Sequence, residues 1–200
     1  WLKFDEGAGV SQYEDSSGNM PPRTIKIDCV PPNCPSYYRA DGMLNHAVTF
    51  SGSATPPLSL PTLAKLRLVD RGFTISLWVN PQGSTAEVSS LALLQSENNR
   101  IRLSLQRYDK TSYTPSVILN GTPVALDFVD GFDRRVLANV WNNLVVKYSY
   151  TTGELGELDV LINGALIAKK TGLSPISTDD LLWLGDAAGA VAFSIDDLRI

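Results

Sequence analysis

From residue 73 onward the chain alternates apolar and polar residues with a period of two, and this pattern limits the fold more than any other feature. The segment 73–80 shows it most clearly, because its odd positions are apolar and its even positions, apart from Trp78, are polar. A β-strand presents alternate side chains to opposite faces. No window of a dozen residues has the spacing of an amphipathic helix. The sequence therefore predicts an all-β protein.

Further strands and turns follow at regular intervals. Strands are predicted at residues 88–95, 100–107, 115–119, 123–128 and 141–150. Asn120-Gly121 and Asn163-Gly164 predict two hairpins, since this pair tolerates the positive φ angles of a type I′ turn. Two rows are predicted to be buried, one of Leu144, Val146 and Tyr148, the other of Leu158, Val160 and Ile162. This spacing is typical of a β-sandwich or barrel.

The first 70 residues differ from the rest, with Gly, Ser, Pro and Asp concentrated in residues 7–22 and 31–42. We expect long surface loops there. Cys29 and Cys34, the only cysteines, enclose four residues and favour a local disulfide, with two free thiols as the alternative. A zinc half-site is disfavoured because the single His46 cannot complete four ligands. A disulfide favours an extracellular or cell-surface location.

Charge and hydropathy exclude several partners. The chain has 17 basic and 21 acidic residues, giving a net charge of −4 without long runs of one sign. Nucleic acid is therefore a poor partner. No segment approaches the roughly 20 apolar residues that a spanning helix needs, so membrane insertion is not expected. The 200 residues, 44% of them hydrophobic, can bury one sizeable core.

A set of motifs resembles a known family when the motifs are taken in order. They are Trp1–Gly9, Asp15-Ser16-Ser17-Gly18-Asn19, Ala47–Gly52, Phe73–Val79, Trp141–Val146, Gly153–Leu155 with Val160–Gly164, Leu182–Gly185 and Phe193–Ile200. Together they resemble the laminin-G-like jelly-roll domains of the concanavalin A-like lectin and glucanase superfamily. The resemblance implies one antiparallel β-sandwich of two sheets over residues 1–200, with a loop insert at about 20–42.

The last motif predicts a local irregularity. The apolar residue Ile195 has an odd sequence number, whereas the apolar residues Leu198 and Ile200 have even ones. The strand must therefore contain one extra residue at the Asp196-Asp197 pair, as it does in a β-bulge. Because the strand pattern still runs at Ile200, we expect the chain to be part of a longer polypeptide.

The resemblance also implies a structural Ca²⁺ ion. Related sandwiches often hold calcium near these elements, and the oxygen ligands here would come from Asp15, Asn19 and Asp196 or Asp197. The alternative is that Asp15 and Asn19 only cap turns. No ligand spacing of the EF-hand kind is present.

Sugar binding needs an aromatic face together with amides or carboxylates. Trp78 points away from its apolar row, so it either lines an exposed sheet face or packs beneath a loop. Tyr108 and Tyr113 flank a polar loop, which would form one rim of a sugar site. Asn98 lies on a turn that we expect to be next to this loop. The other tryptophans lie in motifs of the resemblance and are interpreted as structural: Trp1, Trp141 and Trp183.

Catalysis is not expected. A glucanase on this scaffold needs two carboxylates across a cleft, and the catalytic strand of such enzymes carries a Glu-x-Asp-x-x-Glu signature. The nearest match, Glu157-Leu158-Asp159, continues into apolar residues and lacks the last acid. The single His46 has no nucleophile-elbow pattern nearby.

The sequence therefore predicts a noncatalytic binding or adhesion module of a larger exported or cell-surface protein, which recognises a glycan or a surface protein. The alternative is a structural domain that self-associates with neighbouring copies in a bacterial surface filament, sheath or giant adhesin.

Overall fold

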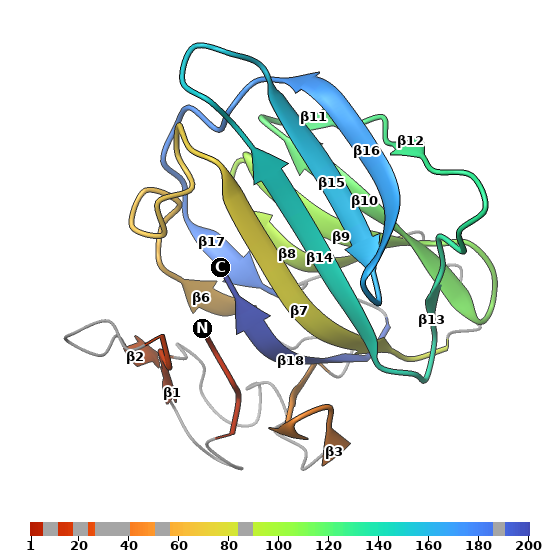
Figure 1. Cartoon of the computed structure of the whole chain (residues 1–200). Helices are drawn as coiled ribbons and strands as arrows, with labels where there is room; N and C mark the ends of the chain where they lie inside the picture. Colours follow the sequence, from red (N-terminus) through yellow and green to blue (C-terminus); the bar gives the residue numbers. More distant parts are fainter. Residues whose placement is uncertain (6–11, 18–23, 27–40, 51–56, 84–89, 186–190) are drawn as a thin grey trace.

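The computed structural model describes residues 1–5, 12–17, 24–26, 41–50, 57–83, 90–185 and 191–200. These residues form two seven-stranded antiparallel sheets packed face to face, in agreement with the predicted all-β sandwich (Figure 1). The described part of the chain contains no helix that could cross a membrane.

The front sheet faces the reader in Figure 1. Its strands run in the order β12 (Asp127–Phe128), β16 (Ala165–Leu173), β15 (Gly156–Ile162), β14 (Asn142–Ser149), β7 (Phe73–Pro81), β18 (Phe193–Arg199) and β5 (Val48–Phe50). The back sheet lies behind it. Its strands run in the order β11 (Thr122–Pro123), β10 (Ser112–Leu119), β9 (Ile101–Arg107), β8 (Ser90–Ser96), β17 (Leu182–Leu184) and β6 (Leu58–Leu60), and β13 (Val136–Leu137) also pairs with β10.

Two short hairpin-like pairs complete the strands in the first 50 residues. They are β1 (Gln12–Glu14) with β2 (Thr24–Lys26), and β3 (Asp41–Gly42) with β4 (Asn45–His46). The predicted disulfide between Cys29 and Cys34, and most of the insert predicted at about 20–42, lie outside the described residues.

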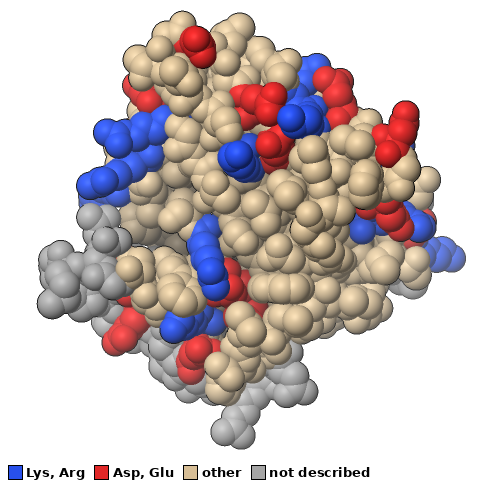
Figure 2. Space-filling view, viewed as in Figure 1, with Lys and Arg blue, Asp and Glu red and all other residues tan. Residues whose placement is uncertain are grey.

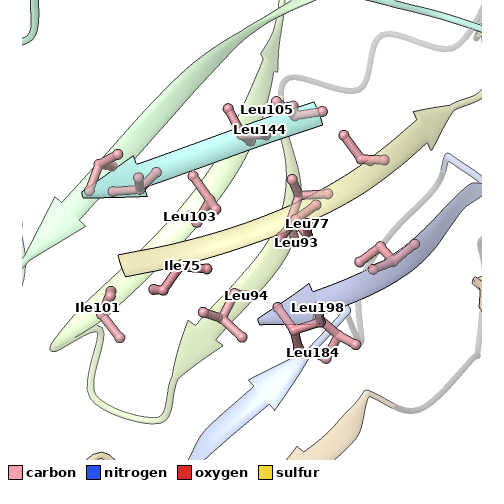
Figure 3. Packing of buried hydrophobic residues seen from close by; sticks show 14 of the residues in the cluster. Ile75, Leu77, Leu93, Leu94, Ile101, Leu103, Leu105, Leu144, Leu184 and Leu198 are labelled. Carbon is pink, nitrogen blue, oxygen red and sulfur yellow. The ribbon is translucent and has the colours of Figure 1, made fainter. Parts of the chain in front are cut away.

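The hydrophobic core fills the space between the two sheets. Side chains from β7, β14 and β18 meet side chains from β8, β9 and β17 there (Figure 3). The apolar row of β7 is buried, and so are both rows predicted on β14 and β15. The period-two pattern therefore predicted the inward face of each of these strands correctly.

Both Asn-Gly turns have the predicted conformation. The φ angles are 50° at Asn120 and 77° at Gly121, and 50° at Asn163 and 81° at Gly164. These left-handed values at both central residues are those of a type I′ turn. The turns join β10 to β11 and β15 to β16.

The single strand predicted at 123–128 is instead two short strands in different sheets. β11 pairs with β10 in the back sheet, whereas β12 pairs with β16 in the front sheet. The chain thus crosses from one sheet to the other between Pro123 and Asp127. The alternation of apolar and polar residues did not predict this crossing, because alternation does not indicate which sheet a residue joins.

The predicted bulge lies in β18. Asp196 pairs with Trp78 and Arg199 pairs with Ser76, so three steps on β18 oppose two steps on β7. Asp197 has a φ of 51° at this irregularity. Beside the bulge, the Leu2 backbone nitrogen donates to the Leu198 carbonyl oxygen at 2.8 Å, which places the start of the chain against its last strand.

Candidate functional site

The tyrosines and the asparagine predicted to bind a ligand do not form one rim. Tyr108 is 66% exposed at the turn after β9. Tyr113 is only 3% exposed, and its hydroxyl donates to the Gln82 carbonyl oxygen at 2.8 Å, so its ring belongs to the core. Asn98 lies on the turn before β9. Because β9 has seven residues, about 20 Å separate its two ends.

Asn98 has a local role in this turn. Its backbone and side-chain nitrogens donate to the carboxylate of Asp180, at 2.7 and 3.0 Å. The Leu63 nitrogen donates to the Asp180 carbonyl oxygen at 3.0 Å. Asp180 thereby ties the β8–β9 turn to the segment that follows β6.

Trp78 is half-buried on the outer face of the front sheet, opposite Asn143 on β14. Figure 2 shows this face, where acidic and basic side chains lie next to one another. Lys169 contacts both Glu157, at 2.9 Å, and Asp159, at 3.6 Å. The two carboxylates nearest to a glucanase signature are thus paired with the same lysine.

A shallow hollow of about 670 Å³ lies at one end of the front sheet, beside the loop that joins β14 to β15. Lys147, Glu154 and Leu155 are among its lining residues. Tyr150 also lines it and stacks on Tyr148, with ring centroids 6.2 Å apart. No buried polar atom of this lining lacks a partner, so the hollow itself does not indicate a ligand.

The carboxylates predicted to hold calcium already have protein partners. Asp15 accepts hydrogen bonds from the Trp1 and Ser17 backbone nitrogens, both at 2.9 Å. Asp197 accepts from the Trp1 indole and pairs with Arg199 at 2.9 Å. No group of three His, Cys, Asp or Glu residues suited to a metal occurs within the described ranges. Asn19 lies outside them, so the calcium site stays a prediction.

Asp196 is fully buried on the outward side of β18. Its Oδ2 accepts a hydrogen bond from the Leu44 nitrogen at 2.8 Å, from the turn between β3 and β4, whereas its Oδ1 has no partner in the described structure. The pKa of Asp196 is raised to about 6, mainly because burial disfavours the charged form. The neighbouring charges of Asp197 and Asp5 add to the rise, and hydrogen bonds from the Leu44 and Asp197 backbone nitrogens oppose it. The carboxylate anchors the turn between β3 and β4 to the front sheet.

The outer face of the back sheet gathers a different set of side chains. Leu182 and Leu184 face the core, so Trp183 between them faces outward, and it is half-buried. Trp183 pairs with Gln95 on β8, and Gln95 pairs with Arg102 on β9. Directly paired residues of an antiparallel sheet lie on the same face. An indole, an amide and a guanidinium therefore form one row across three adjacent strands.

Small polar residues lie beside this row. Ser104 and Ser116 pair across β9 and β10, and Gln106 and Thr114 pair one step further along. The Gln106 amide donates to the Ser116 hydroxyl at 3.3 Å. We call the set of these four residues with Trp183, Gln95 and Arg102 the back face. It offers one aromatic surface and several hydroxyl and amide groups.

The sequence did not lead us to group these residues, because Trp183 was interpreted as structural and its outward orientation was not considered. The signal was present in the alternation, since Trp183 lies between two leucines and Arg102 lies between Ile101 and Leu103. What the sequence did not provide was the pairing of β17 with β8 and of β8 with β9, which brings Gln95 between them.

Comparisons with known proteins agree with the architecture. A laminin-G family model, described as the concanavalin A-like lectin/glucanases superfamily, matches residues 52–200. The receptor-binding domain of botulinum neurotoxin type G is similar with a TM-score of 0.55 at 14% identity, over 96% of this chain and 47% of that chain. The chain thus spans about half the length of that domain.

A second similar structure is the native heptameric SAP-like pentraxin from Limulus polyphemus. Its TM-score is 0.54 at 13% identity, over 76% of this chain and 74% of the pentraxin. At such identities the likeness shows the fold alone. No curated protein matches the sequence. Because the family model covers about three quarters of its residues, the chain belongs to the laminin-G-like family of the concanavalin A-like lectin/glucanase superfamily.

Proposed function

We propose that this protein is a noncatalytic saccharide-binding module and that the back face is its binding surface. The observation that carries the proposal is the row formed by Trp183, Gln95 and Arg102 on three adjacent strands. Neighbouring strands lie about 4.8 Å apart, so the row extends over about 10 Å. An extended oligosaccharide can contact all three side chains at once.

The chemistry of the row suits a sugar. A pyranose ring has an apolar face that packs on an indole, and its edge carries hydroxyl groups that donate and accept hydrogen bonds. The Gln95 amide offers both a donor and an acceptor, and Arg102 offers donors only. The hydroxyls of the half-buried Thr114 and Ser116 beside them add groups that can do either.

The absence of suitable carboxylates supports a noncatalytic role. Glycoside hydrolysis uses two acids on opposite sides of the scissile bond. None of the seven back-sheet strands contains Asp or Glu. On the front sheet, Glu157 and Asp159 both contact Lys169.

The proposed setting is a larger exported or cell-surface protein, in which this module attaches its parent to a glycan. A disulfide between Cys29 and Cys34 would fit that setting. A structural calcium ion near Asp15 would also fit it, since extracellular modules bind calcium at millimolar concentrations.

A glycan array followed by calorimetric titration tests the proposal. We expect saturable binding of at least one oligosaccharide at about micromolar affinity. Trp183→Ala should weaken it at least about tenfold, about 1.4 kcal/mol, because the stacking surface is lost. Trp78→Ala is the matched control, since Trp78 is also half-buried and faces outward, but from the front sheet.

Two results would contradict the proposal. One is an array of neutral and acidic glycans on which the folded protein binds nothing. The other is a glycan whose binding is lost in Trp78→Ala but unchanged in Trp183→Ala, which would place the site on the front sheet.

A further inference from the structure

Arg102 carries a positive charge on the back face that the described protein does not neutralise. It is half-buried near the start of β9, between its cross-strand neighbours Gln95 and Ile118. Its Nε is shielded from solvent and has no hydrogen-bond partner in the described structure. Buried polar groups almost always have a partner. The described part of the chain thus supplies no acceptor for this guanidinium donor.

The composition of the back sheet explains why Arg102 has no partner. Its strands contain two charged residues, Arg102 and Arg107, and both are basic. The front-sheet strands instead combine five acidic with four basic residues. The chain as a whole has more acidic than basic residues, with a net charge of −4, whereas the back-sheet strands contain no acidic residue.

Two other arginines have carboxylate partners. Arg135 pairs with Asp133 at 2.8 Å and Arg199 pairs with Asp197 at 2.9 Å. A guanidinium binds a carboxylate through two parallel N–H groups, which is the strongest hydrogen-bonding arrangement available to it. The described strands around Arg102 supply no carboxylate for such a pair.

We infer that the ligand of the back face is an acidic saccharide whose anionic group pairs with Arg102. This inference rests on the proposed function and narrows it to one class of sugar. The anionic group is a carboxylate, as in uronic and sialic acids, or a sulfate. Gln95, next to Arg102 in the row, then contacts the same sugar or its neighbour, and Trp183 packs on a ring face.

The test compares acidic saccharides with neutral ones of the same backbone. The probes are oligomers of glucuronate, galacturonate and mannuronate, a sialylated oligosaccharide, the carboxyl-reduced form of each, and sulfated forms of the reduced oligomers. Calorimetric titration should give at least about tenfold tighter binding of an acidic member than of its reduced form. The affinity should also fall between about 50 and about 300 mM salt, because added ions screen the charge pair.

Variants at Arg102 assign the preference to this residue. Arg102→Gln should remove the difference between the acidic and reduced forms, and Arg102→Lys should keep part of it, since lysine retains the charge without the parallel donors. Arg135→Gln, at an arginine already paired with Asp133, should leave the preference unchanged. Because Nε of Arg102 has no partner, Arg102→Gln should not lower the melting temperature of the free protein.

The outcomes separate the inference from the proposed function. Equal binding of the acidic and reduced forms by the wild type, through Trp183, would overturn the inference and leave the proposed function standing. Binding to none of these saccharides would overturn both. A sulfated oligomer that binds better than every uronate, in an Arg102-dependent way, would assign the anionic group as sulfate. A melting temperature that falls by many degrees in Arg102→Gln would show that Arg102 has a structural partner and overturn the inference.

Discussion

Asp196 carries a carboxylate that the fold removes from water. Its Oδ2 accepts a hydrogen bond from the Leu44 nitrogen at 2.8 Å, whereas its Oδ1 has no partner in the described structure. Its pKa of about 6 lies above the ordinary 3.8, mainly because burial disfavours the charged form. The difference corresponds to about 3 kcal/mol. The protein thus tolerates a destabilising charge at neutral pH.

The pH dependence of stability should reveal this charge. Between about pH 4 and pH 6 the native protein keeps a proton that the unfolded chain has released, so the free energy of unfolding falls as the pH rises. Asp196→Asn keeps an acceptor for the Leu44 nitrogen and has no charge. We expect the variant to exceed the wild type by up to about 3 kcal/mol at neutral pH and to match it near pH 4.

Urea unfolding of both proteins across this pH range checks the prediction. Acids with lowered pKa values, such as Asp133 and Asp179, act in the opposite direction at lower pH. They act equally in both proteins, so only the difference between the two curves counts. Parallel curves would mean that Asp196 titrates normally and that its burial does not disfavour its charge.

At the scale of elements, two glycines with positive φ show how differently turns constrain the strands they join. Gly185, directly after β17, has a φ of 93°, and a Cβ there would lie 2.4 Å from the Phe50 ring. That ring stacks on Phe193, with centroids 4.8 Å apart. Gly121, in the turn after β10, has a φ of 77° and nothing within 4 Å of the Cβ position.

Alanine at these two positions should therefore have unequal effects. Gly121→Ala should lower the free energy of unfolding by about 1 kcal/mol, the cost of a left-handed conformation for a residue with Cβ. Gly185→Ala should lower it by about 1–3 kcal/mol more, because the methyl group displaces the Phe50 ring from the core. Urea denaturation of the two variants measures the difference. Equal losses would show that the ring moves aside freely.

Features set by neighbouring residues were predicted well from the sequence. The buried rows follow from alternation, and both type I′ turns follow from the Asn-Gly pairs. The bulge at Asp196 and Asp197 follows from the shift of apolar residues from odd to even sequence positions within the last six residues.

Features set by pairing between distant strands were not predicted. The neighbours of β17 come from residues about 90 and 120 positions earlier in the chain, and no local pattern encodes that choice. Asn98 was therefore placed beside Tyr108, although β9 lies between them. The outward orientation of Trp183 was readable from the leucines on either side, but the sequence did not reveal which side chains lie beside it.

At the scale of the whole molecule, the two outer faces of the sandwich differ in their charged residues and in the segments that lie over them. The outward side of β18 is covered where the Leu44 nitrogen donates to Asp196, and on β15 and β16 the front sheet carries Glu157 and Asp159 paired with Lys169. The back face has no acid in any of its strands. One sandwich thus presents two chemically different surfaces, and the proposed saccharide site lies on the back one.

The most direct test of this assignment is a nuclear magnetic resonance titration of the four tryptophan indole N–H signals with a saccharide that the protein binds. Single tryptophan-to-phenylalanine variants assign the four signals. The account predicts a saturable shift of the Trp183 signal and none of the Trp78 signal, because these indoles lie on opposite outer faces of the sandwich. A Trp183 signal that stays in place at saturation while the Trp78 signal moves would contradict it.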